Sequence, residues 1–165
     1  MGEAICRKFA KEGAKVVVAD YNFEGALKVA NEINAEILDA ATAIKTDVSV
    51  ETDINAMIDT AITLYGKLDI LVNNAGIVAL PERVYEMSAE RLERMFAVNV
   101  MGSIRSAQEA VRRMSTRHGG KGGSIVNLSS MAALLGAVGQ YVDYAASKGA
   151  IETFTIGLAK EVATE

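Results

Sequence analysis

The fold is decided by the stretch LDILVNNAG at residues 68–76. Residues 68–72 are mostly apolar and predict a strand. Polar side chains and a glycine follow the run at once, and ligands of open parallel sheets bind beyond the carboxyl ends of the strands. The stretch therefore predicts a strand at 68–72 that leads into a candidate binding loop at 73–76.

Apolar runs and helical patterns alternate on both sides of this strand. Further strands are predicted at residues 15–19, 43–46 and 124–128, and helices at residues 2–12, 22–35, 50–65, 88–117 and 140–165. Ser88 is the predicted N-cap of the longest helix. Strands that alternate with helices at this spacing predict an α/β fold with a right-handed, doubly wound parallel sheet.

The composition limits the partners of the chain. Half of its 165 residues are apolar, and 17 basic against 21 acidic side chains give a net charge of -4. Because no block of Lys or Arg could follow a phosphate backbone, nucleic acid is not an expected partner. A single Cys and a single His, 112 positions apart, predict no metal site.

The apolar runs and the first residues of the chain indicate its cellular location. None of them approaches the about 18 residues of a membrane span, and the first residues do not match a signal peptide. We therefore expect no membrane association and a cytoplasmic protein.

Tyr144 and Lys148 stand four positions apart in the last predicted helix, so their side chains share one face. A cation beside a phenol favours the phenolate, and such a tyrosine can accept and donate a proton. Taken alone, a Tyr and a Lys at this spacing more often mark a solvated helix face. The residues upstream decide between the two interpretations.

Every predicted strand is followed by polar side chains. These are Asp20, Asp47, Asn73 with Asn74, and Ser129 with Ser130. Any one of them could be an ordinary loop residue, because polar caps and loops begin where strands end. Four such strand ends on one rim of a parallel sheet favour a binding site.

Asp20 lies 18 residues after Gly2. In dinucleotide-binding units about 20 residues separate the glycine turn from the acid that binds the ribose. A carboxylate at this place accepts hydrogen bonds from the adenosine ribose hydroxyls and repels a 2′-phosphate. No Arg or Lys stands beside Asp20, so the sequence predicts NAD rather than NADP.

Four motifs together resemble those of the short-chain dehydrogenase/reductase family, in order and in spacing. They are Asn73-Asn74-Ala75-Gly76, Asn99-Val100-Met101-Gly102, Ser129-Ser130 and Tyr144-x-x-x-Lys148. The resemblance covers essentially all 165 residues. It implies one Rossmann-like NAD(P)-binding domain over residues 1–165, and an oxidoreductase that interconverts a secondary alcohol and a ketone by hydride transfer with NAD(H).

The resemblance also implies roles for individual residues. Tyr144 is the expected catalytic acid/base, Lys148 the cation that assists it and bonds the nicotinamide ribose, and Ser130 the group that polarises the substrate carbonyl. Ser130 precedes Tyr144 by 14 positions, one more than is common in the family, so Ser129 remains an alternative. Asn99 is expected to hold a water in a proton relay, or else to brace the helix as a buried amide.

Further contacts with the cofactor follow from the same resemblance. Asp47 with Val48 resembles the adenine contact, and Asn73, Ala75 and Gly76 resemble the wall on the adenosine side. Family members assemble through the long helix and the last helix, which implies a homodimer or homotetramer.

The resemblance departs at both ends of the chain. Family members begin with a strand and a Thr-Gly-x-x-x-Gly-x-Gly turn, of which Met1-Gly2 matches the last two positions, and they continue with further strands after the last helix. We therefore expect an incomplete sheet, with either a gap or a direct pairing of residues 16–18 with 70–72. Such a chain is expected to be inactive unaided. The alternative is a non-catalytic fragment or interaction module that retains the family motifs.

Overall fold

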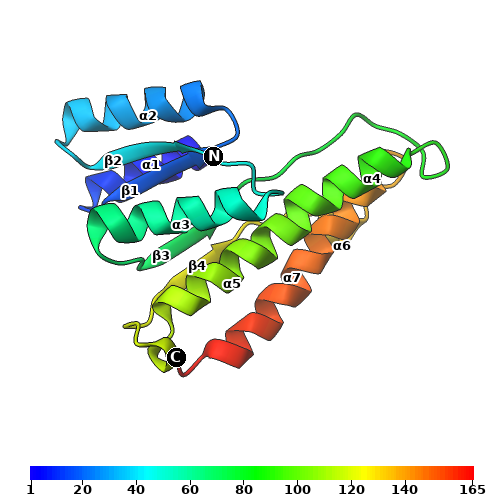
Figure 1. The fold of residues 1–165 in the computed structure, drawn as a ribbon. Coiled ribbons are helices and arrows are strands. Elements are labelled where there is room, and N and C mark those ends of the chain that lie inside the picture. Colours follow the sequence, from blue (N-terminus) through cyan, green and yellow to red (C-terminus); the bar gives the residue numbers. More distant parts are fainter. The chain divides into compact units, whose positions relative to one another are not determined.

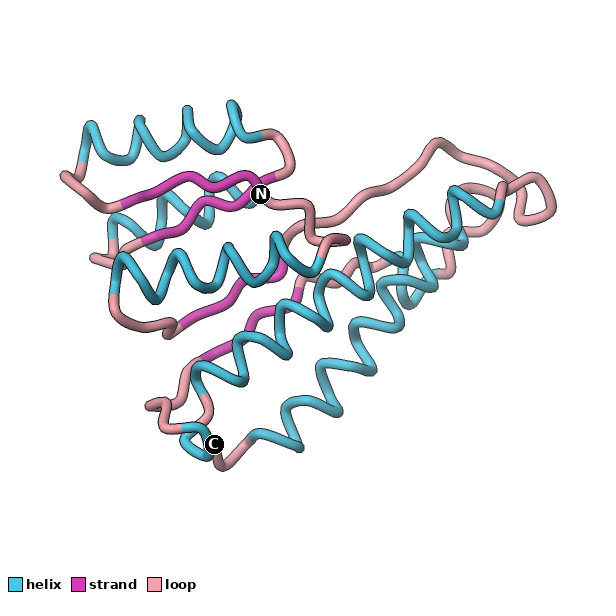
Figure 2. The backbone as a smooth tube through the Cα atoms, viewed as in Figure 1, coloured by secondary structure: helices cyan, strands magenta, loops and turns pink.

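The computed structural model describes residues 1–165 as two compact units, Met1–Leu68 and Asp69–Glu165 (Figure 1). Helices and strands alternate along the chain, as the tube in Figure 2 shows. No helix has both the length and the apolar character needed to cross a membrane.

The first unit is built on two parallel strands. Its elements are α1 (Gly2–Lys11), β1 (Val16–Asp20), α2 (Phe23–Glu36), β2 (Ala41–Lys45) and α3 (Glu51–Tyr65). β1 pairs with β2 in a register that runs from Val16 opposite Ala41 to Asp20 opposite Lys45. All three helices pack against β1. Its main core cluster is made of alanines, valines and Ile33, and Ile54 and Ile58 of α3 are buried as well.

Local sequence explains where the helices of this unit begin and end. The side chain of Asn22 accepts a hydrogen bond from the Gly25 amide at 3.2 Å and so caps α2. α3 ends at Gly66, whose φ of 77° lies in the left-handed region that glycine adopts without strain.

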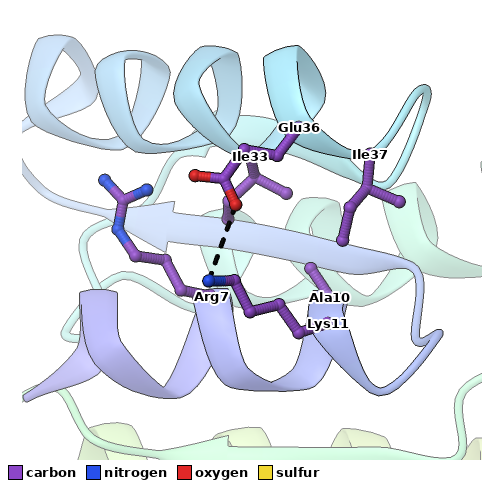
Figure 3. A pocket seen from close by; sticks show the side chains of 6 residues that line it. All are labelled: Arg7, Ala10, Lys11, Ile33, Glu36 and Ile37. Atoms are coloured by element: carbon purple, nitrogen blue, oxygen red, sulfur yellow. Dashed lines mark ion pairs between the residues drawn. The ribbon is translucent and has the colours of Figure 1, made fainter.

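A small hollow of about 10 Å³ lies between α1 and α2 (Figure 3). Arg7 and Ile33 are among the residues that line it, and the ion pair between Lys11 and Glu36 crosses it at 3.6 Å. It is large enough for a water and too small for a cofactor.

The second unit also contains two parallel strands. Its elements are β3 (Ile70–Asn73), α4 (Ala89–Phe96), the π-helical η1 (Ala97–Gly102), α5 (Ser103–Met114), the 3-10 helix η2 (Thr116–His118), β4 (Ser124–Asn127), α6 (Ala132–Leu135) and α7 (Val142–Val162). β3 pairs with β4 from Ile70 opposite Ser124 to Asn73 opposite Asn127. α5 packs on β3, and α7 packs on β4 and η1.

The helix predicted at 88–117 is present from Ala89 to Met114, and it contains a π-helical turn that was not predicted. Ser88 caps it as expected, by accepting a hydrogen bond from the Arg91 amide at 3.2 Å. The α-helix changes to a π-helix at Ala97–Gly102, where the fully buried Asn99 lies, and it ends at Met114 because Ser115 is extended with ψ 134°. π-helical turns within α-helices are frequent at functional sites. The short helix α6, between Ser130 and Tyr144, was not predicted from the sequence.

The parallel strands and the helices between them confirm an α/β fold. The four strands form two separate sheets of two strands each. β1 and β2 make one two-stranded sheet, and β3 and β4 make another. A direct pairing of residues 16–18 with 70–72, one of two expected outcomes, would join the two units and stays a prediction. Each strand lies within two residues of its predicted position.

Candidate functional site

The predicted site residues fall into both units. Asp20, Asp47 and Val48 belong to the first unit; Asn73, Ala75, Gly76, Asn99, Ser130, Tyr144 and Lys148 belong to the second. We describe each group within its own unit.

In the first unit, the ends of β1 and β2 place two carboxylates on adjacent strands. The Thr46 amide donates to the Asp20 carbonyl at 2.9 Å and so joins the two strand ends. The exposed Asp20 carboxylate accepts one hydrogen bond, from the Asn22 amide at 2.8 Å. Asp47 accepts from the amide and hydroxyl of Ser49 at 2.9 and 2.6 Å, which fixes the loop that carries Val48. Asp20 retains oxygen lone pairs that face solvent and could accept ribose hydroxyls.

In the second unit, Asn99 is a fully buried hub. Its Oδ1 accepts from the Ile77 amide at 2.8 Å, and its Nδ2 donates to the Ile77 carbonyl at 2.9 Å and to Ser147 Oγ at 3.0 Å. These bonds connect η1, the loop after β3 and α7. The structure thus contains the bracing contacts of the buried amide, and the water relay stays a prediction.

Lys148 lies against this hub. Its side chain is buried, and Nζ donates to the Leu128 carbonyl at 2.7 Å and lies over the ring of Tyr144, 5.8 Å from the centroid. A Cβ placed on Gly76 would lie 3.3 Å from Asn99 Oδ1 and 3.5 Å from Lys148 Nζ, so the absent side chain lets the loop approach both groups. Burial lowers the pKa of Lys148, because the charged ammonium loses solvation.

The hydroxyl of Tyr144 is available for chemistry. The side chain is partly exposed, and only its backbone carbonyl takes part in a side-chain hydrogen bond, accepting from Ser147 Oγ at 2.7 Å. The ring contacts Tyr141 edge-on, with centroids 5.8 Å apart and an interplanar angle of 85°. Packing on this neighbour and on Lys148 holds the ring while the oxygen stays without a protein partner.

The two candidate serines differ in how their hydroxyls are used. Ser129 Oγ donates to Glu152 Oε1 at 2.8 Å, so its proton is already bound. Ser130 Oγ accepts from the Ala132 amide at 3.1 Å, which leaves its proton for a substrate oxygen. This difference favours Ser130 over Ser129 as the polarising group.

Asn73 differs from the other loop residues. Its Nδ2 donates to Asn127 Oδ1 at 2.9 Å and to the Ser103 carbonyl at 3.1 Å, so its amide joins β3 to β4 and α5. A contact of Asn73 with the cofactor stays a prediction.

A larger hollow of about 190 Å³ lies between α5, β4 and α7, and none of the predicted site residues lines it.

Sequence reasoning missed one cluster beside the site. Asp143, which directly precedes Tyr144, has a fully buried carboxylate that pairs with Arg91 of α4 at 2.8 Å. The hydrogen bonds from Arg91 hold the pKa of Asp143 below its usual value. The partners stand 52 positions apart. A carboxylate in the first turn of the Tyr144 helix was the one available signal for this cluster.

Comparison with known proteins identifies the family. The model of the short chain dehydrogenase family matches residues 1–165, and the chain belongs to that family. The uncharacterized oxidoreductase YgfF of Escherichia coli is 44% identical, over 100% of this chain and 67% of its own length. Xanthoxin dehydrogenase of Arabidopsis thaliana is 38% identical, over 100% of this chain and 56% of its own length.

A solved structure agrees with the fold. A short-chain type dehydrogenase/reductase from Mycobacterium marinum superposes with a TM-score of 0.90 at 32% sequence identity, and the match covers 98% of this chain and 64% of that one. The residues described here thus form part of a Rossmann-like fold. The chain spans between about half and two thirds of the length of the curated relatives named above.

Proposed function

We propose that the protein containing these residues interconverts a secondary alcohol and a ketone, with NAD(H) as the cofactor. The observation that carries the proposal is that Gly76, Asn99 and Lys148 lie together, and that Lys148 Nζ lies over the ring of Tyr144, whose hydroxyl has no protein partner. A bound nicotinamide would supply the hydride acceptor or donor.

The side chains of the second unit suit the proton half of this reaction. During oxidation, Tyr144 takes the proton of the substrate hydroxyl while hydride leaves the carbinol carbon; during reduction, it returns the proton to the ketone oxygen. Ser130 donates a hydrogen bond from its hydroxyl to the same substrate oxygen and keeps its proton. Lys148 Nζ lies over the ring of Tyr144, and its remaining N–H donors can bond a ribose hydroxyl.

The residues present fit a dinucleotide on two observations. A side chain on Gly76 would fill the space beside Lys148 Nζ, so this glycine keeps room for a ligand at the amine. In the first unit, Asp20 offers an exposed carboxylate to an adenosine ribose, and we propose that it excludes a 2′-phosphate and favours NAD. Asp47, Val48 and Ala75 complete the proposed cofactor set.

The alternative to an enzyme is a non-catalytic fragment or interaction module that retains the family motifs. Addition of NAD discriminates the two. A ligand present at a hundred times its dissociation constant raises the free energy of unfolding by about 2.7 kcal/mol. We expect this rise for the enzyme and no change for a non-catalytic module.

The remaining expectations stand as proposals. The substrate is a small alcohol or ketone, the protein is cytoplasmic, and the complete form is a homodimer or homotetramer. Light scattering of the longest soluble form that carries residues 1–165 tests the assembly, and a monomer mass would contradict it.

Substitution of Tyr144 tests the catalytic assignment. Tyr144→Phe keeps the ring and its contact with Tyr141 and removes the reacting hydroxyl, so turnover should fall at least about 100-fold. Cofactor binding should be largely kept. Tyr141→Phe is the matched control, because it removes a neighbouring hydroxyl and keeps the edge-on ring contact. Equal turnover of Tyr144→Phe and the unsubstituted protein would remove Tyr144 from the mechanism.

A further inference from the structure

Arg91 is at the centre of a hydrogen-bond network that connects three segments of the second unit. Its Nε and Nη2 donate to the two carboxylate oxygens of Asp143 at 2.8 and 3.1 Å. Its Nη1 donates to the Leu80 carbonyl and to Glu82 Oε2, both at 2.8 Å. The loop after β3, helix α4 and the first turn of α7 are thus joined through one planar guanidinium.

Asp143 completes the start of α7. The N-cap residue of this helix, Tyr141, makes no side-chain capping bond. Backbone amides of Tyr144 and of Asp143 itself also lower the pKa of this carboxylate, after the larger effect of Arg91. An acidic side chain in the first turn of a helix interacts favourably with the helix dipole, and Arg91 holds the Asp143 carboxylate in place.

A second connection lies one helical turn further along α7. Asn99 Nδ2 donates to Ser147 Oγ at 3.0 Å, and Asn99 lies on the continuation of α4. Tyr144 thus stands between two residues, Asp143 and Ser147, that are both tied to the same helical segment. The tie at Ser147 alone would leave the first turn of α7 free to fray.

We propose that Arg91 is a positioning residue, which fixes the first turn of α7 through Asp143 and thereby aims the hydroxyl of Tyr144. The inference rests on the proposed function of Tyr144 as the acid/base. Arg91 itself touches neither substrate nor cofactor in this account.

A purely structural role would not require a guanidinium at this place. Burying an ion pair removes two charges from water, and well-packed apolar side chains of similar volume often give equal or greater stability. The planar fork of arginine adds a fixed geometry, which an apolar contact does not supply. Catalysis depends steeply on geometry, and a displacement of about 1 Å can cost about 100-fold in rate.

Two variants separate positioning from stability. Arg91→Leu leaves the buried Asp143 carboxylate without its cation and should be strongly destabilised. The double variant Arg91→Leu/Asp143→Leu removes both charges and should recover most of the lost stability. If Arg91 positions Tyr144, kcat of the double variant stays at least about tenfold below that of the unsubstituted protein, with KM for NAD within about twofold.

Amide hydrogen exchange tests whether Arg91 fixes the first turn of α7, and it does not depend on catalytic activity. Amides of residues 144–147 should exchange at least about tenfold faster in the double variant, while amides of the first unit keep their rates. Arg112→Leu is the matched control, because Arg112 forms an exposed ion pair with Glu109 on α5 and should change neither readout.

The outcomes distinguish this inference from the proposed function. Recovery of kcat together with stability in the double variant, or unchanged exchange at 144–147, overturns the positioning role. If the unsubstituted protein has no oxidoreductase activity, the proposed function fails, and exchange at 144–147 still decides whether Arg91 orders the start of α7. All measurements use the longest soluble form that carries residues 1–165.

Discussion

The two units of this chain are built from the same kind of parallel strand pair, yet their interiors differ. The first unit has an apolar core, and Thr46 is its one fully buried polar residue. The second unit buries seven polar or charged residues: Asn99, Ser103, Ser106, Ser115, Asp143, Ser147 and Lys148. Four of these lie in or next to the Tyr144 site. The comparison indicates that the second unit gives up apolar packing to hold reactive groups in place.

The largest expected effect is a loss of stability on substitution of Asn99, and it tests whether buried polar contacts distinguish the second unit from the first. Asn99→Leu keeps the volume of the side chain and removes the hydrogen bonds from a fully buried position to the Ile77 amide and carbonyl and to Ser147 Oγ. The free energy of unfolding should fall by at least about 3 kcal/mol. Denaturant titration measures it.

Ile54→Val in the first unit is the control for Asn99→Leu. Ile54 is fully buried, and deleting one methyl group there should cost about 1 kcal/mol. An equal or smaller cost of Asn99→Leu would mean that polar bracing does not distinguish the second unit.

Much of the first unit was predictable from the sequence, because its elements follow simple patterns. The apolar run at Val16–Asp20 and the stop at Gly66 need no knowledge of distant residues. The second unit was less predictable. The π-helical turn at Ala97–Gly102 depends on bonds from Asn99 to residues 22 and 48 positions away. Local periodicity contains no information about such bonds.

The candidate site shows the same limit. Motif spacing was sufficient to name Gly76, Asn99 and Lys148, and the structure places these three residues together. The pairing of Arg91 with Asp143 could not be predicted, because any acid at a helix start can be explained by the helix dipole alone. Only the fold brings the two side chains within 2.8 Å.

A smaller effect concerns the charge at the start of α7. Arg91 lowers the pKa of Asp143 below 3.8, so this carboxylate contributes stability that is fully present above pH 3.8 and is lost as the pH falls below that value. Asp143→Asn should therefore cost about 2 kcal/mol at neutral pH, and the cost should shrink in acid. Unfolding of both proteins between pH 2 and 7 measures it, and a cost independent of pH would contradict the role of the charge.

The proposed role of Asp20 in the choice of cofactor can be tested by substitution. Asp20→Asn removes the exposed negative charge at the end of β1 and keeps an oxygen that can accept from the Asn22 amide. If the charge repels a 2′-phosphate, the ratio of kcat/KM for NAD to that for NADP should fall by about tenfold, which equals about 1.4 kcal/mol. Asp39→Asn, a change of the same kind in the loop between α2 and β2, is the control. A preference for NADP in the unsubstituted protein would contradict the proposed role of Asp20.

The smallest expected effect sharpens the contrast from the side of the first unit. Thr46 Oγ1 is buried and has no hydrogen-bond partner, so it carries a desolvation cost without a compensating bond. Thr46→Val replaces the hydroxyl by a methyl group of similar size and should raise the free energy of unfolding by about 1 kcal/mol. Thr42→Val is the matched control, because Thr42 Oγ1 is hydrogen-bonded to the Tyr65 hydroxyl at 2.9 Å and the same change there should destabilise. Opposite signs for the two variants are expected in thermal unfolding. A loss of stability in Thr46→Val would mean that its hydroxyl is bonded to water in solution, and that the first unit, too, depends on a buried polar contact beside Asp47.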